Sequence, residues 1–301
     1  MRNKRNFLSK KDYLSIKKRT VFLGFLGNVS LFLLKILIGF VSNSLAVMSD
    51  AFNSLSDIVT SIILFVSILV GGKSADNEHP FGHYRSEPIG SLIVAVLTVV
   101  LGFEILRISV SRFITNSFPK FSQLALFLLI GTIIAKSLMY LYTKFSWNKT
   151  QSPAIFALAI DHRNDILISI FAIIGFLGSS FNLFFLDSLV AFFIGAWIIK
   201  VGISIGIKSI KYLIGETAEP ELIKKISKAV LKISGVSSIQ KIKAHYVGIL
   251  LQVEVHIRVN RNISVYRSHT IETNARRIIE RFKEVDRAFV HIDPIIKSRP
   301  H

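Results

Sequence analysis

The sequence predicts a membrane domain of six helices followed by a small α+β domain, and three observations lead to this fold class. Hydrophobic residues make up 51% of the 301 residues, more than is usual for a soluble domain. They gather in runs of about 20 or more residues, the helix length that crosses a hydrocarbon core about 30 Å thick. The rest of the chain, from residue 207, has the shorter helical and alternating patterns of a soluble α+β domain.

Six apolar runs are the expected spans. They cover residues 20–41, 45–71, 88–111, 121–144, 153–178 and 183–206. We therefore expect an all-α transmembrane domain over residues 20–206. A basic N-terminal arm over residues 1–19 precedes this domain, and a linker with the C-terminal domain over residues 207–301 follows it.

The charge distribution predicts the orientation of the spans. The chain carries 37 Lys and Arg against 19 Asp and Glu, a net charge of +18, and the basic residues concentrate at both ends and in particular loops. Basic residues favour the cytoplasmic side of a bilayer, so the densely basic residues 1–19 place the N-terminus there. Six spans return the C-terminus to the same side. We expect a multi-pass protein of a bacterial inner membrane.

A strongly basic chain could also bind nucleic acid. Here the topology accounts for the charge, and the C-terminal segment lacks a platform of stacking aromatic residues. The sequence therefore favours the lipid bilayer, with its anionic inner leaflet, and no nucleic acid as the partner of the basic segments.

The C-terminal segment predicts the order helix, strand, strand, helix, strand. Residues 219–233 and 264–283 carry apolar residues at helical spacing, and residues 286–293 make the last strand. Residues 249–259 alternate, with apolar side chains at odd positions and polar side chains between them. This order suits a two-layer α+β fold.

Polar residues inside the expected spans indicate a cation site, since a carboxylate at a helix centre costs about 2.5–3.5 kcal/mol on insertion scales. Asn53 and Asp57 lie four residues apart in the second span, and Asp161 and Asp165 lie four apart in the fifth. Residues at this spacing share a helix face, so two facing helices would bring four oxygen-bearing side chains together. Asp50 would line an access path to this site or sit at the membrane interface.

The alternative is that these residues are polar contacts between helices, satisfied by water or by Lys35 and Lys136. Two matched pairs on separate spans favour the cation site. His162 points about 100° away from the residue before it on a helix, so we expect it to lie outside the site. Glu104 and Arg107 are three residues apart in the third span and are expected to pair with each other.

The loop between the second and third spans contains a second group of candidate ligands, Asp76, His79 and His83. The two His residues flank a Pro-Phe-Gly turn. The chain has no Cys, so a metal must be held by His, carboxylates, amides, carbonyls or water. Imidazole and carboxylate together suit a first-row metal. The alternative is a solvated loop with incidental His residues.

The C-terminal domain contains a third group. His291 and Asp293 share a strand face, and His256 lies on the polar face of its strand. A cluster of these residues would bind metal, whereas the alternative is an ordinary polar sheet face. His269 falls opposite the apolar stripe of its helix, so it would need a partner chain or a bent geometry to join them.

Three segments then stand in a characteristic order: SLAVMSDAFNSLSD, HPFGHYRSEPIGSLI and DHRNDILIS. They resemble the cation diffusion facilitator family, the proton-coupled exporters of zinc, iron, manganese and related metals, over essentially the whole chain. The resemblance implies a homodimer whose cytoplasmic domain is ferredoxin-like, as in metallochaperones. It places the transport site at Asn53, Asp57, Asp161 and Asp165, and a second site at Asp76, His79 and His83.

In members that have a cytoplasmic site, the resemblance places it at His256, His269, His291 and Asp293. This chain departs from the pattern at Gln240, where zinc and iron members often have another His. His245 lies five residues further on. One alternative is that it takes the place of that His in the cytoplasmic site, and the other is that it lies outside the site.

The transport site departs from zinc-transporting members, which usually offer at least one His at the four positions. An amide and three carboxylates are hard oxygen donors, which suit Mn²⁺ better than Fe²⁺ or Zn²⁺. We therefore expect a secondary transporter, not an enzyme, that exchanges cytoplasmic Mn²⁺ for protons without a cofactor. The metal would be its substrate and could also regulate it. The alternatives are an exporter of Fe²⁺, Zn²⁺ or Co²⁺, and a metal-sensing regulatory membrane protein with little transport.

Overall fold

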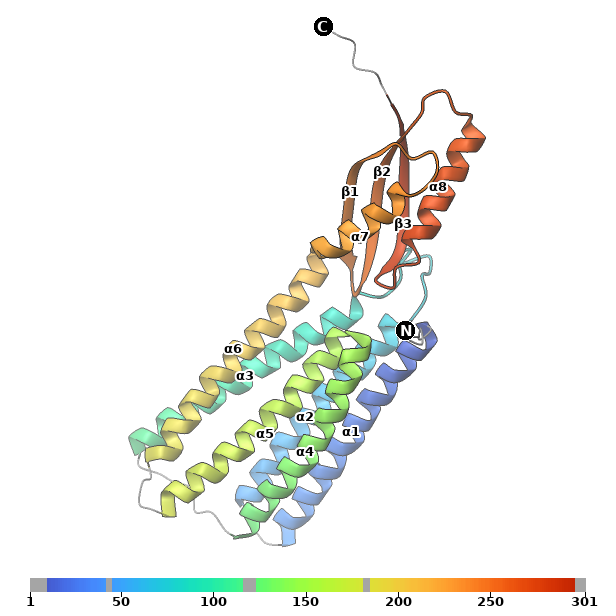
Figure 1. The fold of residues 1–301 in the computed structure, drawn as a ribbon. Coiled ribbons are helices and arrows are strands. Elements are labelled where there is room, and N and C mark those ends of the chain that lie inside the picture. Colours follow the sequence, from blue (N-terminus) through green and yellow to red (C-terminus); the bar gives the residue numbers. More distant parts are fainter. Residues whose placement is uncertain (1–9, 42–44, 116–122, 181–184, 296–301) are drawn as a thin grey trace, which may run out of the picture. The chain divides into compact units, whose positions relative to one another are not determined.

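The computed structural model describes residues 10–41, 45–115, 123–180 and 185–295 (Figure 1). The chain forms two compact units. The first contains the residues up to Ser74 and Ser86–Ile210, and it is helical. The second contains Ala75–Arg85 and the residues from Lys211 onward, and it holds a three-stranded sheet.

Six long helices build the first unit (Figure 1). They are α1 (Lys10–Val41), α2 (Leu45–Gly71), α3 (Ser86–Thr115), α4 (Gln123–Thr150), α5 (Pro153–Ser180) and α6 (Phe185–Ile214). Within the described ranges, five of them are long and apolar enough to cross a membrane, namely α1, α2, α3, α4 and α6. The sixth, α5, carries Asp161, Arg163 and Asp165 close together in its apolar run.

Helix α1 begins at Lys10, inside the segment that the sequence predicts as a polar arm. Two contacts explain why the helix extends beyond the apolar run. Leu14 packs against the hydrophobic core of the helical unit. The Lys17 ammonium is buried and pairs with the buried carboxylate of Glu87 at the start of α3. The basic residues from Lys10 onward therefore belong to helix α1, and one of them, Lys17, pairs with α3.

Helices α3 and α6 approach each other closely because glycines face the contact. A Cβ atom on Gly102 would lie 2.7 Å from Ile199 Cγ1 and 3.0 Å from the carbonyl oxygen of Gly195. A Cβ atom on Gly202 would lie 3.0 Å from the carbonyl oxygen of Ala95. Small residues of this kind are the usual means by which membrane helices bring their backbones into contact.

The second unit contains α7 (Pro220–Leu231), β1 (Ser238–Val247), β2 (Leu250–Val259), α8 (Val265–Ile279) and β3 (Val285–Pro294). The strand order is β1-β2-β3, with β1 antiparallel and β3 parallel to the central β2. The predicted order of helices and strands is the observed one. The predicted fold class, a helical membrane domain with a small α+β domain, is thus confirmed.

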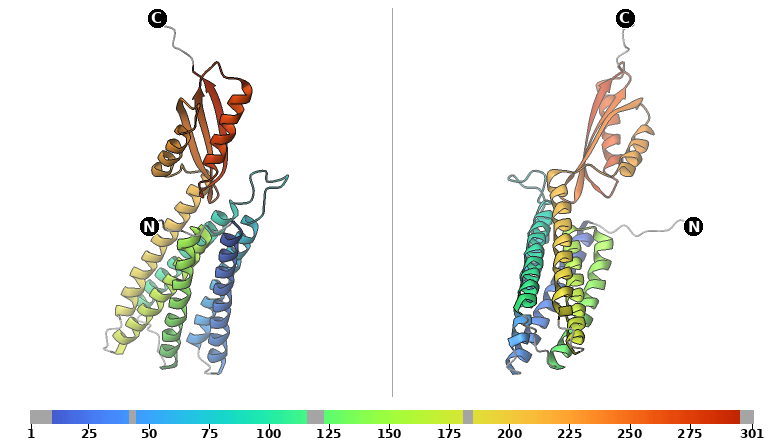
Figure 2. Two further views of the ribbon diagram at one scale, coloured as in Figure 1. Left: turned by 45° about the vertical axis from the view of Figure 1, so that its right-hand side comes forward. Right: turned by 90° about the vertical axis from the view of Figure 1, so that its left-hand side faces the viewer.

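Both helices of this unit cover one face of the sheet (Figure 2). The odd residues of β2 are buried in its core, as their alternation predicts, together with Ile226 of α7 and with Ile271 and Ile279 of α8. The even residues of β2 lie on the other face. That open face carries His256, which is paired in register with His291 of β3.

Candidate metal-binding sites

Helices α2 and α5 bring carboxylates together inside the helical unit. Asp57 lies in α2, and Asp161 and Asp165 lie one turn apart in α5. The Nζ atom of Lys136 lies 2.6 Å from Asp57 Oδ2 and 2.5 Å from Asp165 Oδ2. These two oxygens come from different helices and converge on one cationic atom. The same convergence is what a bound metal ion requires of its carboxylate ligands.

The third carboxylate, Asp161, has a buried Oδ2 atom that meets no hydrogen-bond partner within the described part of the chain. A buried oxygen without a partner is costly unless a ligand satisfies it. Asn53 lies in α2 four residues before Asp57, and Asp50 lies nearer the start of that helix. The side chains of Asn53 and Asp50 lie outside the described residues.

Lys136 of α4 completes this cluster. It is 1% exposed, and its ammonium also donates to Asn28 Oδ1 of α1 at 2.9 Å. The Asn28 amide in turn donates to the Asp57 carbonyl oxygen at 3.2 Å and to Ser61 Oγ at 3.1 Å. The ion pairs with Lys136 that the polar-contact interpretation expects are therefore present. The other lysine in that interpretation, Lys35, donates to Ser54 Oγ at 3.1 Å.

The sequence predicted His162 to lie outside the site, whereas the structure brings its imidazole close to two of the carboxylates. It is fully buried, and one of its ring nitrogens lies within 4.8 Å of carboxylate oxygens of Asp161 and Asp165. Neither ring nitrogen has a hydrogen-bond partner within the described residues. The 100° rotation was correct for the Cα position, but the imidazole is long enough to reach back. The imidazole of His162 also packs close to α1, because a Cβ atom on Gly24 would lie 3.6 Å from His162 Nε2.

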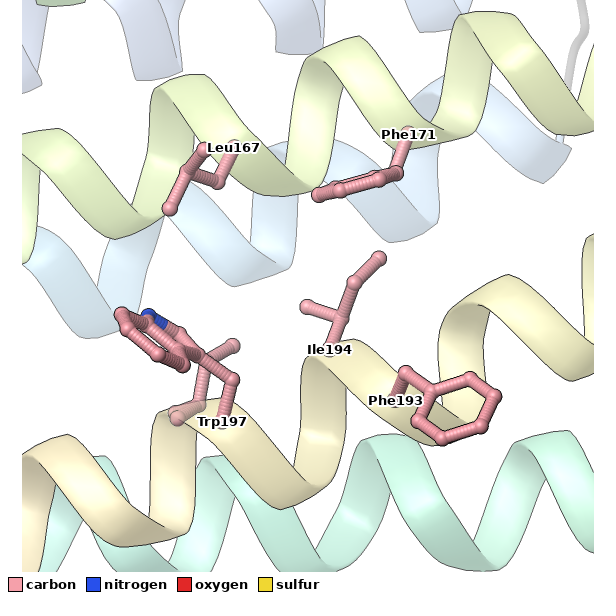
Figure 3. A pocket seen from close by; sticks show the side chains of 6 residues that line it. Leu167, Phe171, Phe193, Ile194 and Trp197 are labelled. Atoms are coloured by element: carbon pink, nitrogen blue, oxygen red, sulfur yellow. The ribbon is translucent and has the colours of Figure 1, made fainter.

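The opposite side of α5 faces an apolar pocket of about 410 Å³ (Figure 3). Its lining comes from α5 and α6, namely Leu167, Phe171, Phe193, Ile194, Trp197 and Ile198. Leu167 is only two residues from Asp165, so α5 has a polar side toward α2 and α4 and an apolar side toward α6. Among the described residues, the lining contains no carboxylate or imidazole, which distinguishes this pocket from the cation cluster.

In the loop before α3, the three predicted ligands lie together. Asp76 Oδ1 is 3.4 Å from His79 Nδ1, and Asp76 Oδ2 is 3.5 Å from His83 Nε2. The two imidazole rings are 4.3 Å apart, and Gly82, with φ of 80°, makes the turn between them. One ligand atom from each residue fits within a 4.8 Å group, as a shared metal would need.

The loop also favours the ionised form of the Asp76 carboxyl, the form that binds metal. The backbone N–H of His79 donates to Asp76 Oδ1 at 2.7 Å, and this bond lowers the pKa of the Asp76 carboxyl below its usual value, with smaller contributions from the two imidazoles. A metal ligand must be deprotonated, so a lowered pKa keeps this carboxylate available at mildly acidic pH.

The open face of the C-terminal sheet brings His256, His291 and Asp293 together. His256 Nδ1 lies 3.6 Å from Asp293 Oδ2, and His291 Nε2 lies 3.3 Å from Asp293 Oδ1. The two rings are 4.9 Å apart. Sequence reasoning missed Glu254, whose Oε1 atom is 2.8 Å from His256 Nε2; this hydrogen bond lowers the pKa of Glu254. Its place two residues before His256 on the same strand face was the available signal.

The other three candidates of this domain do not join the cluster. His269 lies on α8, which covers the opposite face of the sheet, and it is exposed and pairs with Glu272 at 3.3 Å. Gln240 is exposed at a register shift in β1, and His245 is exposed and lies opposite Gln252 in register. Gln240 and His245 lie on β1, which the central β2 separates from His291 of β3.

We expect His291→Ala to weaken metal binding by the C-terminal domain about ten-fold or more, since even outer-shell changes at metal sites cost about 10–100-fold. The measurement is calorimetry with Mn²⁺ and Zn²⁺ on the fragment from residue 212, which has its own hydrophobic core. His269→Ala is the matched control, because it removes an exposed imidazole outside the cluster. An equal loss in both variants would contradict a site at His291.

Comparisons with known proteins show which family both parts of the chain resemble. Residues 21–214 match the family model of the cation efflux transmembrane domain, and residues 218–295 match that of the cation efflux protein cytoplasmic domain. An uncharacterized transporter of Methanocaldococcus jannaschii is 33% identical over 276 residues, which cover 92% of this chain and 98% of the relative.

Two further relatives come from Bacillus subtilis, and both are named manganese efflux system proteins. MneS is 29% identical over 262 residues, covering 87% of this chain and 90% of the relative. MneP is 29% identical over 292 residues, covering 94% of this chain and 98% of the relative. With both family models matched in order, the chain belongs to the cation efflux family, the cation diffusion facilitators, as its three motifs predict.

Proposed function

We propose that this protein exports Mn²⁺ from the cytoplasm in exchange for protons. The observation that carries the proposal is the convergence of Asp57 and Asp165 on one cationic atom, with Asp161 and His162 beside them, in a cation efflux protein. Asn53 would add an amide oxygen from α2. Carboxylate-rich sites suit Mn²⁺, and two relatives are named manganese efflux proteins.

A second candidate is the export of Fe²⁺, Zn²⁺ or Co²⁺, and His162 is the observation that favours it. Imidazole is a better ligand for these later metals than for Mn²⁺. The group of ligand atoms within 4.8 Å of one another therefore contains an imidazole beside the carboxylates of Asp161 and Asp165, not oxygen alone. The three carboxylates still dominate the charge of the site, and this is why we place Mn²⁺ first.

The remaining parts of the chain fit an exporter with regulation on the cytoplasmic side. We infer that both termini lie in the cytoplasm of a bacterial cell, that the protein is a homodimer, and that its C-terminal domain contributes to the dimer. The loop cluster at His79 and the sheet cluster at His291 would bind the same ions as the transport site. A purely metal-sensing protein would have these clusters but would show no flux, so a flux measurement separates the two functions.

Proton coupling should appear as a dependence of metal flux on the pH gradient. Metal and protons compete for the same carboxylate oxygens, because a carboxylate must lose its proton to bind metal. In inside-out vesicles, an acidic lumen should accelerate Mn²⁺ uptake, and an ionophore that collapses the gradient should remove the acceleration. A metal-sensitive dye in the lumen reports the rate. Uptake that ignores the gradient would exclude antiport.

A further inference from the structure

Lys136 is a lysine built into the centre of the membrane domain. Its ammonium is almost fully buried and contacts three side chains from three other helices: Asn28 of α1, Asp57 of α2 and Asp165 of α5. Placing a charge at such depth is costly, and membrane proteins keep one there where it has a partner and a function. The partners here are the carboxylates of the proposed transport site.

The ammonium and a metal ion need the same atoms. Lys136 Nζ is 2.6 Å from Asp57 Oδ2 and 2.5 Å from Asp165 Oδ2, so the ammonium forms a close ion pair with each carboxylate. A divalent cation bridging α2 and α5 through those oxygens would lie where the ammonium lies. Two cations cannot share that position, so the metal must displace the ammonium before it binds both carboxylates.

The charge of the lysine works in the same direction. Asp57, Asp161 and Asp165 supply up to three negative charges, and the Lys136 ammonium, which pairs with two of these residues, offsets one of them. Without the lysine, the cluster would be more negative by one charge, and a more negative site holds a metal cation more tightly in a low-dielectric environment.

We propose that Lys136 is a tethered cation that competes with the metal for Asp57 and Asp165 and so sets the affinity of the transport site. The inference rests on the proposed function, because it takes these carboxylates as metal ligands. When metal enters, the ammonium withdraws toward the side-chain oxygen Oδ1 of Asn28, which it already contacts at 2.9 Å. When metal leaves, the ammonium returns to the carboxylates, so the emptied site is never left with three unpaired charges.

The test is Lys136→Met, which keeps the length and apolar stem of the side chain and removes the charge. Mn²⁺ binding is measured by calorimetry at pH 8 on the full-length protein in detergent. We expect the Kd to fall about ten-fold, or about 1.4 kcal/mol. Mn²⁺ release from loaded vesicles should slow by a similar factor. Titration of the Asp165→Asn variant gives the binding at the loop and C-terminal clusters, which is subtracted.

Lys200→Met is the matched control. It removes one positive charge from α6, where the exposed Lys200 lies over the Trp197 ring, so its Kd should equal that of the wild type. A role for Lys136 in folding alone would weaken binding in Lys136→Met, not tighten it. An unchanged or raised Kd in Lys136→Met would overturn the proposal.

Lys136→Arg provides a second variant that keeps the charge. A guanidinium binds carboxylates in a bidentate manner and competes more strongly than an ammonium, so the Kd for Mn²⁺ should rise about ten-fold. Tighter or unchanged binding in this variant would also overturn the proposal. A wild type without Asp165-dependent Mn²⁺ binding would instead refute the proposed transport site itself, so the two failures are distinguishable.

Discussion

Replacement of Asp57 or Asp165 by Asn should reduce the flux of every divalent ion about a hundred-fold or more. Asn keeps the shape and hydrogen-bonding oxygen of the side chain but removes the charge that binds both the metal and the Lys136 ammonium. Losing a charged ligand should cost at least as much as the 10–100-fold seen for outer-shell changes at metal sites. The measurement is initial uptake into vesicles with Mn²⁺, Fe²⁺, Co²⁺ and Zn²⁺ in turn.

Glu104→Gln is the control for these variants. Glu104 is a carboxylate in the same helical unit, and it pairs with Arg107 through contacts of 2.5 and 2.8 Å on α3, as the sequence predicts. Its loss should leave flux near the wild-type rate. Substantial flux in Asp57→Asn, or an equal loss in Glu104→Gln, would show that the cluster between α2 and α5 does not carry the ion.

The spacing of residues along the sequence predicted which candidate ligands lie close together within a single helix, loop or strand. The i, i+4 rule placed Asp161 and Asp165 on one face of α5, and the short loop brought Asp76 to both of its His residues. In the C-terminal domain, the alternation of β2 identified the polar face that carries His256. Each of these relations depends on backbone geometry within a few residues, which the sequence contains.

Relations between segments could not be predicted in the same way. The sequence named Lys136 and Lys35 as possible partners for the carboxylates, but it could not show that the Lys136 ammonium of α4 reaches Asn28 of α1, Asp57 of α2 and Asp165 of α5 together. The proximity of the His162 imidazole to Asp161 and Asp165 could not be predicted for a related reason, because helical rotation gives the direction from Cα to Cβ and not the reach of an imidazole. Likewise, the separation of His269 from His291 depends on which face of the sheet α8 covers.

Replacement of Asp161 by His should raise the ratio of Zn²⁺ to Mn²⁺ flux about ten-fold or more. The change exchanges a carboxylate for a second imidazole beside His162, whose nitrogen already lies within 4.8 Å of the site's carboxylate oxygens. Imidazole favours Zn²⁺, which accepts four tetrahedral ligands, while Mn²⁺ suits oxygen donors. Ten-fold selectivity requires a difference of only about 1.4 kcal/mol between the two ions. Adding Asn53→His should raise the ratio further.

The flux ratio must be compared with that of Asp161→Asn, which removes the same charge but supplies an oxygen in place of a nitrogen. Loss of charge alone should slow both ions, so Asp161→Asn should leave the ratio close to that of the wild type. A rise that is specific to the imidazole would identify the residue at position 161 as a ligand that discriminates between metals. A wild type that already prefers Zn²⁺, with the ratio unchanged by Asp161→His, would contradict the assignment of Mn²⁺. It would also indicate that His162 already supplies the nitrogen that selects the ion, since His162 is the imidazole within reach of Asp161 and Asp165 in this part of α5.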